Sequence, residues 1–174
     1  YTVTVGGSDA SYGENLLNAS KAGSTFSSWT SAIQYIIQGC ITIADEVGSS
    51  KIGKPYSGED ITYIESPYSW NSITDFYDNI TSVKNSYFGG IEGSRNESKS
   101  IHAWLNENAP EIDAAVVNAI DNALEQIGTG KSDTGKGMAY PFVENIKHDS
   151  VREAVDACAA VVEALEKALA AVAQ

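Results

Sequence analysis

The sequence predicts an all-α protein whose four long helices form an up-and-down four-helix bundle. Two observations predict it: apolar residues recur at intervals of three and four over four long stretches, and Gly or Pro punctuates the ends of those stretches. No two segments alternate as paired strands do. A coiled-coil dimer is the alternative, but only the last stretch keeps a strict heptad. We expect residues 25–174 to form the helical domain and residues 1–24 to form an irregular linker or edge segment.

The first predicted helix runs from Phe26 to Val47, and Gly48 is expected to end it. Its apolar residues follow the helical period: Trp29, Ile33, Ile36, Cys40, Ile43 and Val47. A loop over residues 53–58 is predicted next, because this segment combines Gly, Pro and Ser. Residues 59–65 could be extended.

Three further long helices and one short helix complete the prediction. The helix over residues 66–90 begins at a Ser-Pro pair, which suits an N-cap and a first helical position, and ends at a Gly-Gly pair. Residues 98–108 predict a short helix, and residues 110–127 predict a longer one that starts at a Pro. Residues 140–146 could add a turn. The last helix starts at the Asp149–Ser150 cap signal and alternates steps of four and three through Val151, Val155, Cys158, Val162, Leu165, Leu169 and Val172.

Charge and composition restrict the ligands. A net charge of −12 makes nucleic acid and anionic membrane surfaces unfavourable partners and leaves cations or a basic partner as compatible ones. No apolar run approaches the roughly 20 residues that cross a bilayer. Cys40 and Cys158 both fall on apolar helical stripes, which favours two buried thiols over a disulfide bridge.

Two stripes follow the predicted helix over residues 66–90. One stripe is apolar and contains Ile73, Phe76, Ile80, Val83 and Tyr87. The adjacent stripe contains only short polar side chains: Ser72, Asp75, Asn79, Ser82 and Ser86. A solvated face usually carries long Lys and Glu side chains, so this polar row suits a buried seam or the wall of a cleft. A seam against another helix and an ordinary exposed face are the plainer interpretations.

Metal and phosphate signals are weak. His102 has no His or carboxylate three or four residues away, and His148 stands next to Asp149 at a predicted helix start, which favours solvated or capping roles for the two histidines. Asp45 and Glu46 meet the negative end of a helix dipole, which is unfavourable unless a cation or an amide compensates, so they are weak metal candidates. The Gly-rich residues 128–137 are predicted to be a surface loop. They lack the first Gly and the preceding strand of a phosphate loop.

Two segments carry a family resemblance. Residues 43–55 (IADEVGSSKIGKP) and 65–90 (ESPYSWNSITDFYDNITSVKNSYFGG) resemble the C-terminal half of imelysin-like proteins of the iron-regulated protein family. Residues 110–127, the pair Pro141-Phe142 and the last helix agree with that family in order. The resemblance covers about residues 26–174 and implies the C-terminal bundle of a two-bundle protein.

The resemblance implies a bacterial envelope protein, periplasmic or lipid-anchored at the outer membrane, that is associated with iron uptake. Some members are classed as metallopeptidases, and their Gly-x-His-x-x-Glu motif belongs to the N-terminal bundle; neither histidine here has that spacing. The chain start at Tyr1 suggests a C-terminal fragment whose N-terminal half, with a lipoprotein Cys, could be a separate chain. The family's acidic motif maps onto Asp45 and Glu46. The family's cleft-facing polar row maps onto Ser72, Asp75, Asn79, Ser82 and Tyr87.

Three functions are compatible with these residues. The first is a protein that binds a cation or a small ligand in a cleft between two bundles, with a divalent metal such as iron or zinc as the candidate cofactor. The second is a metallopeptidase whose metal motif lies in the N-terminal half, with Ser72, Asn79 or Tyr87 stabilising the transition state. The third is a structural or partner-binding bundle in which the polar row fixes helix register.

Overall fold

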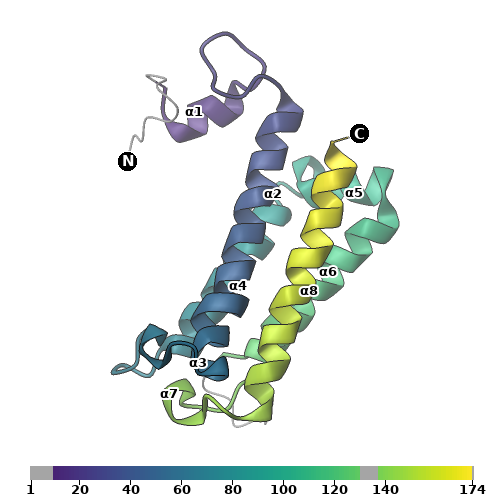
Figure 1. Cartoon of the computed structure of the whole chain (residues 1–174). Helices are drawn as coiled ribbons and strands as arrows, with labels where there is room; N and C mark the ends of the chain where they lie inside the picture. The colour runs from purple at the N-terminus through teal and green to yellow at the C-terminus, as the bar shows by residue number, and fades with distance from the viewer. Residues whose placement is uncertain (1–9, 130–136, 174) are drawn as a thin grey trace.

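The structure, a computed structural model, describes residues 10–129 and 137–173, and these residues are helical with no strand among them. The all-α prediction is therefore confirmed. Four long helices lie side by side (Figure 1). They are α2 (Trp29–Asp45), α4 (Ser72–Tyr87), α6 (Pro110–Ile127) and α8 (Asp149–Val172). Helix α8 packs against α2 and α6, and α4 packs against the same two helices.

Short elements connect the long helices. They are α1 (Tyr12–Leu17), the π-helix η1 (Glu46–Ile52), α3 (Gly53–Ser57), the 3₁₀ turns η2 (Ile61–Tyr63) and η3 (Glu97–Lys99), α5 (Ile101–Asn108) and α7 (Phe142–Asn145). Most buried apolar side chains of the described residues form one large cluster between the long helices. Its largest fully buried members include Tyr87, Phe76, Phe142, Ile37, Ile52 and Ile73. Within the described residues, no helix is both long and apolar enough to cross a membrane.

Gly48 does not end the first long helix as predicted, because the chain continues through it as the π-helix η1. The reason for a glycine here is close packing. A Cβ atom added to Gly48 would lie 2.6 Å from the Cβ atom of Cys158 on α8. Gly48 therefore lets two helices approach each other, and the glycine signal for a helix end was misleading at this position.

The predicted loop over residues 53–58 is also wrong, since residues 53–57 form helix α3. Pro55 lies in the first turn of this short helix, directly after the change from π-helical to α-helical hydrogen bonding. Gly58 adopts a left-handed conformation with φ of 88° and ends α3. The stretch 59–65, considered for extended structure, contains the 3₁₀ turn η2.

Helix α4 begins at Ser72, six residues later than predicted from the Ser-Pro pair. Its N-cap is Asn71, and Ser66 instead has a positive φ of 53°, which an N-cap serine in the usual extended conformation does not have. The other end agrees with the prediction, because α4 ends at Tyr87 and Gly89 follows with φ of 78°.

The bounds of the remaining helices agree more closely with the predictions from the sequence. Helix α6 begins with Pro110 at its first position and ends at Ile127, as predicted. The N-cap of α8 is His148, whose Nδ1 accepts a hydrogen bond from the backbone of Ser150, so the capping role considered for this histidine is confirmed. Cys40 and Cys158 are buried and unbridged.

The expected irregular N-terminal segment contains a helix. Helix α1 is capped by Ser11, whose side chain exchanges hydrogen bonds with Glu14 in a capping box. It packs on the start of α2 through a small second cluster formed by Leu16, Ala19, Phe26 and Ala32. Residues 2–5, where the sequence alternates, and most of the Gly-rich loop over residues 128–137 lie outside the described residues.

Candidate functional site

The polar row of α4 separates into parts with different surroundings. At the N-terminal end of the helix, the carboxylate of Asp75 accepts hydrogen bonds from Ser66 Oγ at 2.6 Å and from Asn71 Nδ2 at 2.7 Å. The hydroxyl of Ser72 is buried and donates to the backbone carbonyl of Glu65. These contacts hold the turn over residues 66–71 against the start of α4. Both Asp75 oxygens are engaged within the chain.

Lys51 brings a positive charge into this end of the row. The π-helix η1 carries Lys51, whose ammonium lies 2.8 Å from Asn79 Oδ1 and 3.0 Å from Glu65 Oε2. Its side chain is only 17% exposed, so the ion pair is partly shielded from water. Lys51 thus occupies the position in which a bound cation would meet Asn79 and Glu65. The row's first three residues form a closed network.

The next two residues of the row have no such network. Ser82 and Ser86 are exposed, and their hydroxyls donate to the backbone carbonyls of Asn79 and Ser82, one turn earlier; Ser86 also interacts with the side chain of Cys40. Such bonds leave the lone pairs of the hydroxyl oxygens available to other donors. Ser86 also lines a groove.

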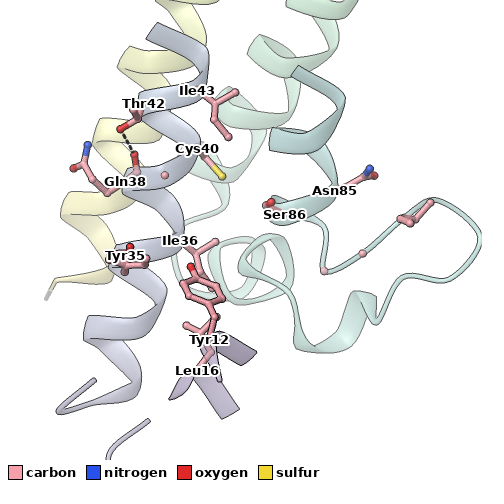
Figure 2. A pocket seen from close by; sticks show the side chains of 14 residues that line it. Tyr12, Leu16, Tyr35, Ile36, Gln38, Cys40, Thr42, Ile43, Asn85 and Ser86 are labelled. Atoms are coloured by element: carbon pink, nitrogen blue, oxygen red, sulfur yellow. Dashed lines mark hydrogen bonds between the residues drawn. The ribbon is translucent and has the colours of Figure 1, made fainter. Parts of the chain in front are cut away.

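The groove is an open hollow of about 820 Å³ between α1, α2 and the C-terminal end of α4. Figure 2 shows the side chains of α2 and α4 on its two walls, with Tyr12 and Leu16 of α1 at one end. Its lining is largely apolar and contains no charged side chain. The lining residues are Tyr12, Leu16, Tyr35, Ile36, Gln38, Gly39, Cys40, Thr42, Ile43, Asn85, Ser86, Gly89, Gly90 and Ile91.

Tyr87 lies away from the row, contrary to the position that the resemblance implies. It is 1% exposed and belongs to the apolar stripe of α4, and its hydroxyl donates to Asp113 Oδ1 at 2.7 Å. His102 Nδ1 lies 2.8 Å from the same oxygen. Burial, followed by the hydrogen bond and the charge of Asp113, raises the pKa of Tyr87 far above its ordinary value.

This buried cluster of Tyr87, His102 and Asp113 was missed by sequence reasoning. Spacings of three and four residues identify partners within one helix only, whereas His102 lies on α5 and Asp113 comes from the next helix, α6. A signal was present, because Asp113 falls on the buried stripe of α6 three residues before Val116. A carboxylate on an apolar stripe requires a partner.

The weak metal candidates remain unsupported by geometry. Asp45 and Glu46 are exposed at the junction of α2 and η1. Across residues 10–129 and 137–173, no group of three or more His, Cys, Asp or Glu side chains is arranged to hold a metal ion. The donors present in this part of the chain therefore do not form a metal site by themselves. Their role as ligands stays a prediction.

Comparison with known proteins places these features in a family context. The profile of the imelysin family matches residues 6–169. A structure described as an iron-regulated protein A precursor from Parabacteroides distasonis is similar to the chain, with 28% identity and a TM-score of 0.79. The similarity covers 93% of this chain and 47% of that one.

A second solved structure, described as an imelysin peptidase from Bacteroides ovatus, is 31% identical with a TM-score of 0.74. Here the similarity covers 90% of this chain and 44% of the other. The chain therefore spans less than half the length of either structure. No curated protein matches the chain.

Proposed function

Because the chain belongs to the imelysin family, we propose that it is one half of a bacterial envelope protein of iron uptake, which binds a cation or a small ligand in a cleft between two helical bundles. The observation that carries the proposal is the groove beside α4 on a chain that spans less than half the length of its relatives. The other half of the protein, in the same or a separate chain, forms the opposite wall of the cleft. The protein resides in the periplasm or is held at the outer membrane as a lipoprotein.

The polar edge of the groove favours a small molecule or a metal chelate over a bare ion as the ligand. Asn85 and Ser86 supply hydrogen-bonding groups beside an apolar surface that includes Ile91. A concave, mostly apolar surface with a few polar groups is typical of sites for small molecules. A metal chelate fits this description and agrees with the description of the Parabacteroides distasonis structure as an iron-regulated protein. In this proposal a bare iron or zinc ion draws ligands from the other half.

Direct titration tests the proposal. Protein that contains both halves should bind at least one of ferric citrate, FeCl₃ and ZnCl₂ in calorimetric titration, with retention confirmed by elemental analysis. Asn85→Leu should weaken the binding of ferric citrate at least tenfold, because it removes a polar group from the groove. Asn118→Leu is the matched control, since Asn118 is exposed on α6 and does not line the groove. Failure of all three probes to bind would contradict the proposal.

A metallopeptidase is the second candidate, and the description of the Bacteroides ovatus structure as an imelysin peptidase favours it. In this alternative the metal belongs to the other half, and Asn79 would be the group from this chain nearest to an open surface. The hydroxyls of Ser72 and Tyr87 already donate to acceptors within the chain. Peptide cleavage that copurifies with the protein and is abolished by a chelator would support this function. Cleavage unaffected by the chelator would exclude it.

A structural role for part of the row is the third candidate. Asp75 accepts hydrogen bonds from Ser66 and Asn71, and Asn79 accepts one from Lys51, as the residues of a register-fixing polar seam do. This role concerns the N-terminal end of α4 and is compatible with ligand binding at its C-terminal end.

A further inference from the structure

Among residues 10–129 and 137–173, no contact requires a glycine at position 39. It lies in the middle of α2 and is exposed, and a Cβ atom placed on it would meet nothing within 4 Å. Glycine inside a helix is about 0.5–1 kcal/mol less favourable than alanine. Packing does not compensate for that cost here, in contrast to Gly48. A bare backbone is useful at Gly39 if another element approaches α2 closely at this point.

The surroundings of Gly39 have the form of a helix-docking hole. Ile36, Gly39, Cys40 and Ile43 follow the spacing i, i+3, i+4, i+7, and all four line the groove. Four residues with this spacing form the hole that receives one side chain of a facing helix. Because one of its four border residues is a glycine, the hole lacks one wall side chain and leaves more room for an incoming apolar side chain. The bordering rings of Tyr12 and Tyr35 lie 6.3 Å apart.

The composition of the groove indicates a protein partner. None of its 14 lining residues is charged, although charged residues make up 20% of the sequence. Depletion of charged residues is the compositional signal of the core of a protein interface. Large apolar side chains are also exposed along it: Tyr12, Tyr35 and Ile91. Such a patch on a strongly acidic chain marks a surface that another element covers.

We propose that the α2 wall of this groove is the docking surface for the other half of the full-length protein, with a helix of that half packing against the α2 backbone at Gly39. This inference rests on the proposed function for the identity of the partner. We assign the other half as the occupant of the groove because this chain covers only 47% and 44% of two similar structures. The docked helix presents an uncharged face, and one of its large apolar side chains fills the hole. The α4 wall, with Asn85 and Ser86, stays free to contact a ligand.

Hydroxyl-radical footprinting of the full-length protein tests this proposal. In the wild-type protein, Tyr12 and Tyr35 should be oxidised at least fivefold more slowly than Tyr68, which is 99% exposed and serves as an internal reference. Gly39→Leu should abolish that protection, because the added side chain fills the hole. Ala159→Leu places the same residue on an exposed position of α8 outside the groove and should leave the protection intact. Circular dichroism and the Tyr68 oxidation rate verify that both variants are folded.

Three outcomes would overturn the inference. Oxidation of Tyr35 at the Tyr68 rate in the wild-type protein would show that nothing covers the groove. Protection that survives Gly39→Leu would place the covering contact elsewhere on the groove. Protection that disappears on dilution, together with a dimer-to-monomer change in sedimentation, would identify a second copy as the occupant. Ligand titration of the same protein is independent of these footprinting results. Failure of the docking proposal can therefore be distinguished from failure of the proposed function.

Discussion

Gly39 and Gly48 lie on one continuous helical run, yet Gly48 is buried and Gly39 is exposed. At Gly48 the absent side chain is explained by Cys158, which leaves no room for a Cβ atom. At Gly39 the space that a side chain would occupy is empty. Gly48 shows that a glycine within a helix can mark a close contact with another helix, and our proposal extends this interpretation to Gly39 and an element outside the chain.

The largest effect is expected at Gly48. Gly48→Ala forces a Cβ atom to within 2.6 Å of the Cβ atom of Cys158, so η1 and α8 must separate. Overpacking of this kind costs about 1–3 kcal/mol of unfolding free energy. Urea denaturation measures it. An unchanged midpoint would show that η1 and α8 do not pack as closely as described.

The neighbours Ser86 and Tyr87 extend the comparison to α4, where one residue faces the groove and the other the core. Tyr87→Phe leaves the buried carboxylate of Asp113 without one of its donors and should cost about 1–3 kcal/mol in unfolding free energy. Ser86→Ala removes an exposed hydroxyl that donates to the carbonyl of Ser82, and should change stability by less than about 0.5 kcal/mol. Equal losses in the two variants would contradict the assignment of inner and outer faces.

Alkaline pH should destabilise the inner face through its thiol. Burial raises the pKa of Cys158 to about 12 and that of Cys40 to about 11. Because the folded-state pKa values are raised, the stabilising contribution is complete below the ordinary thiol pKa, near 8.5, and is lost as the pH rises towards 11–12. Unfolding free energies measured between pH 7 and pH 10.5 should fall, and less steeply in Cys158→Ala. An equal slope in both proteins would refute this cause.

The closed network at the start of α4 should contribute stability and no ligand binding. Asp75→Ala removes the acceptor of Ser66 and Asn71 and should lower the unfolding free energy by about 1 kcal/mol. Titration with ferric citrate should be unchanged, because both Asp75 oxygens are engaged within the chain. Lost ligand binding with an unchanged melting temperature would reverse this assignment and support Asp75 as an oxygen donor.

Much of the fold was predictable because apolar periodicity controls where long helices form. The bounds of α6 and the cap of α8 followed from Pro110 and from the residues around His148. Glycine and serine signals were less reliable, because their meaning depends on residues distant in sequence. Gly48 is a glycine because it packs closely against Cys158 on another helix. Ser66 forms a hydrogen bond with Asp75 instead of capping a helix.

The candidate site was only partly predictable for the same reason. The polar row was visible from helical geometry, but its division into a closed network and a groove edge depends on Lys51, which the π-helix brings beside Asn79. The contact between His102 and Asp113 joins two helices and has no short-range spacing. The groove itself is a property of three elements together, and no local pattern describes it.

Gly39→Ala provides the most direct test of the central claim, that α2 is covered at Gly39 by the other half of the protein. In this chain expressed alone, alanine should raise the unfolding free energy by about 0.5–1 kcal/mol, since the added methyl group meets empty space. In the full-length protein the same substitution should lower the melting temperature, because the methyl group intrudes into the docked contact. A sign reversal between the two proteins is the predicted result. Stabilisation in both would contradict the claim.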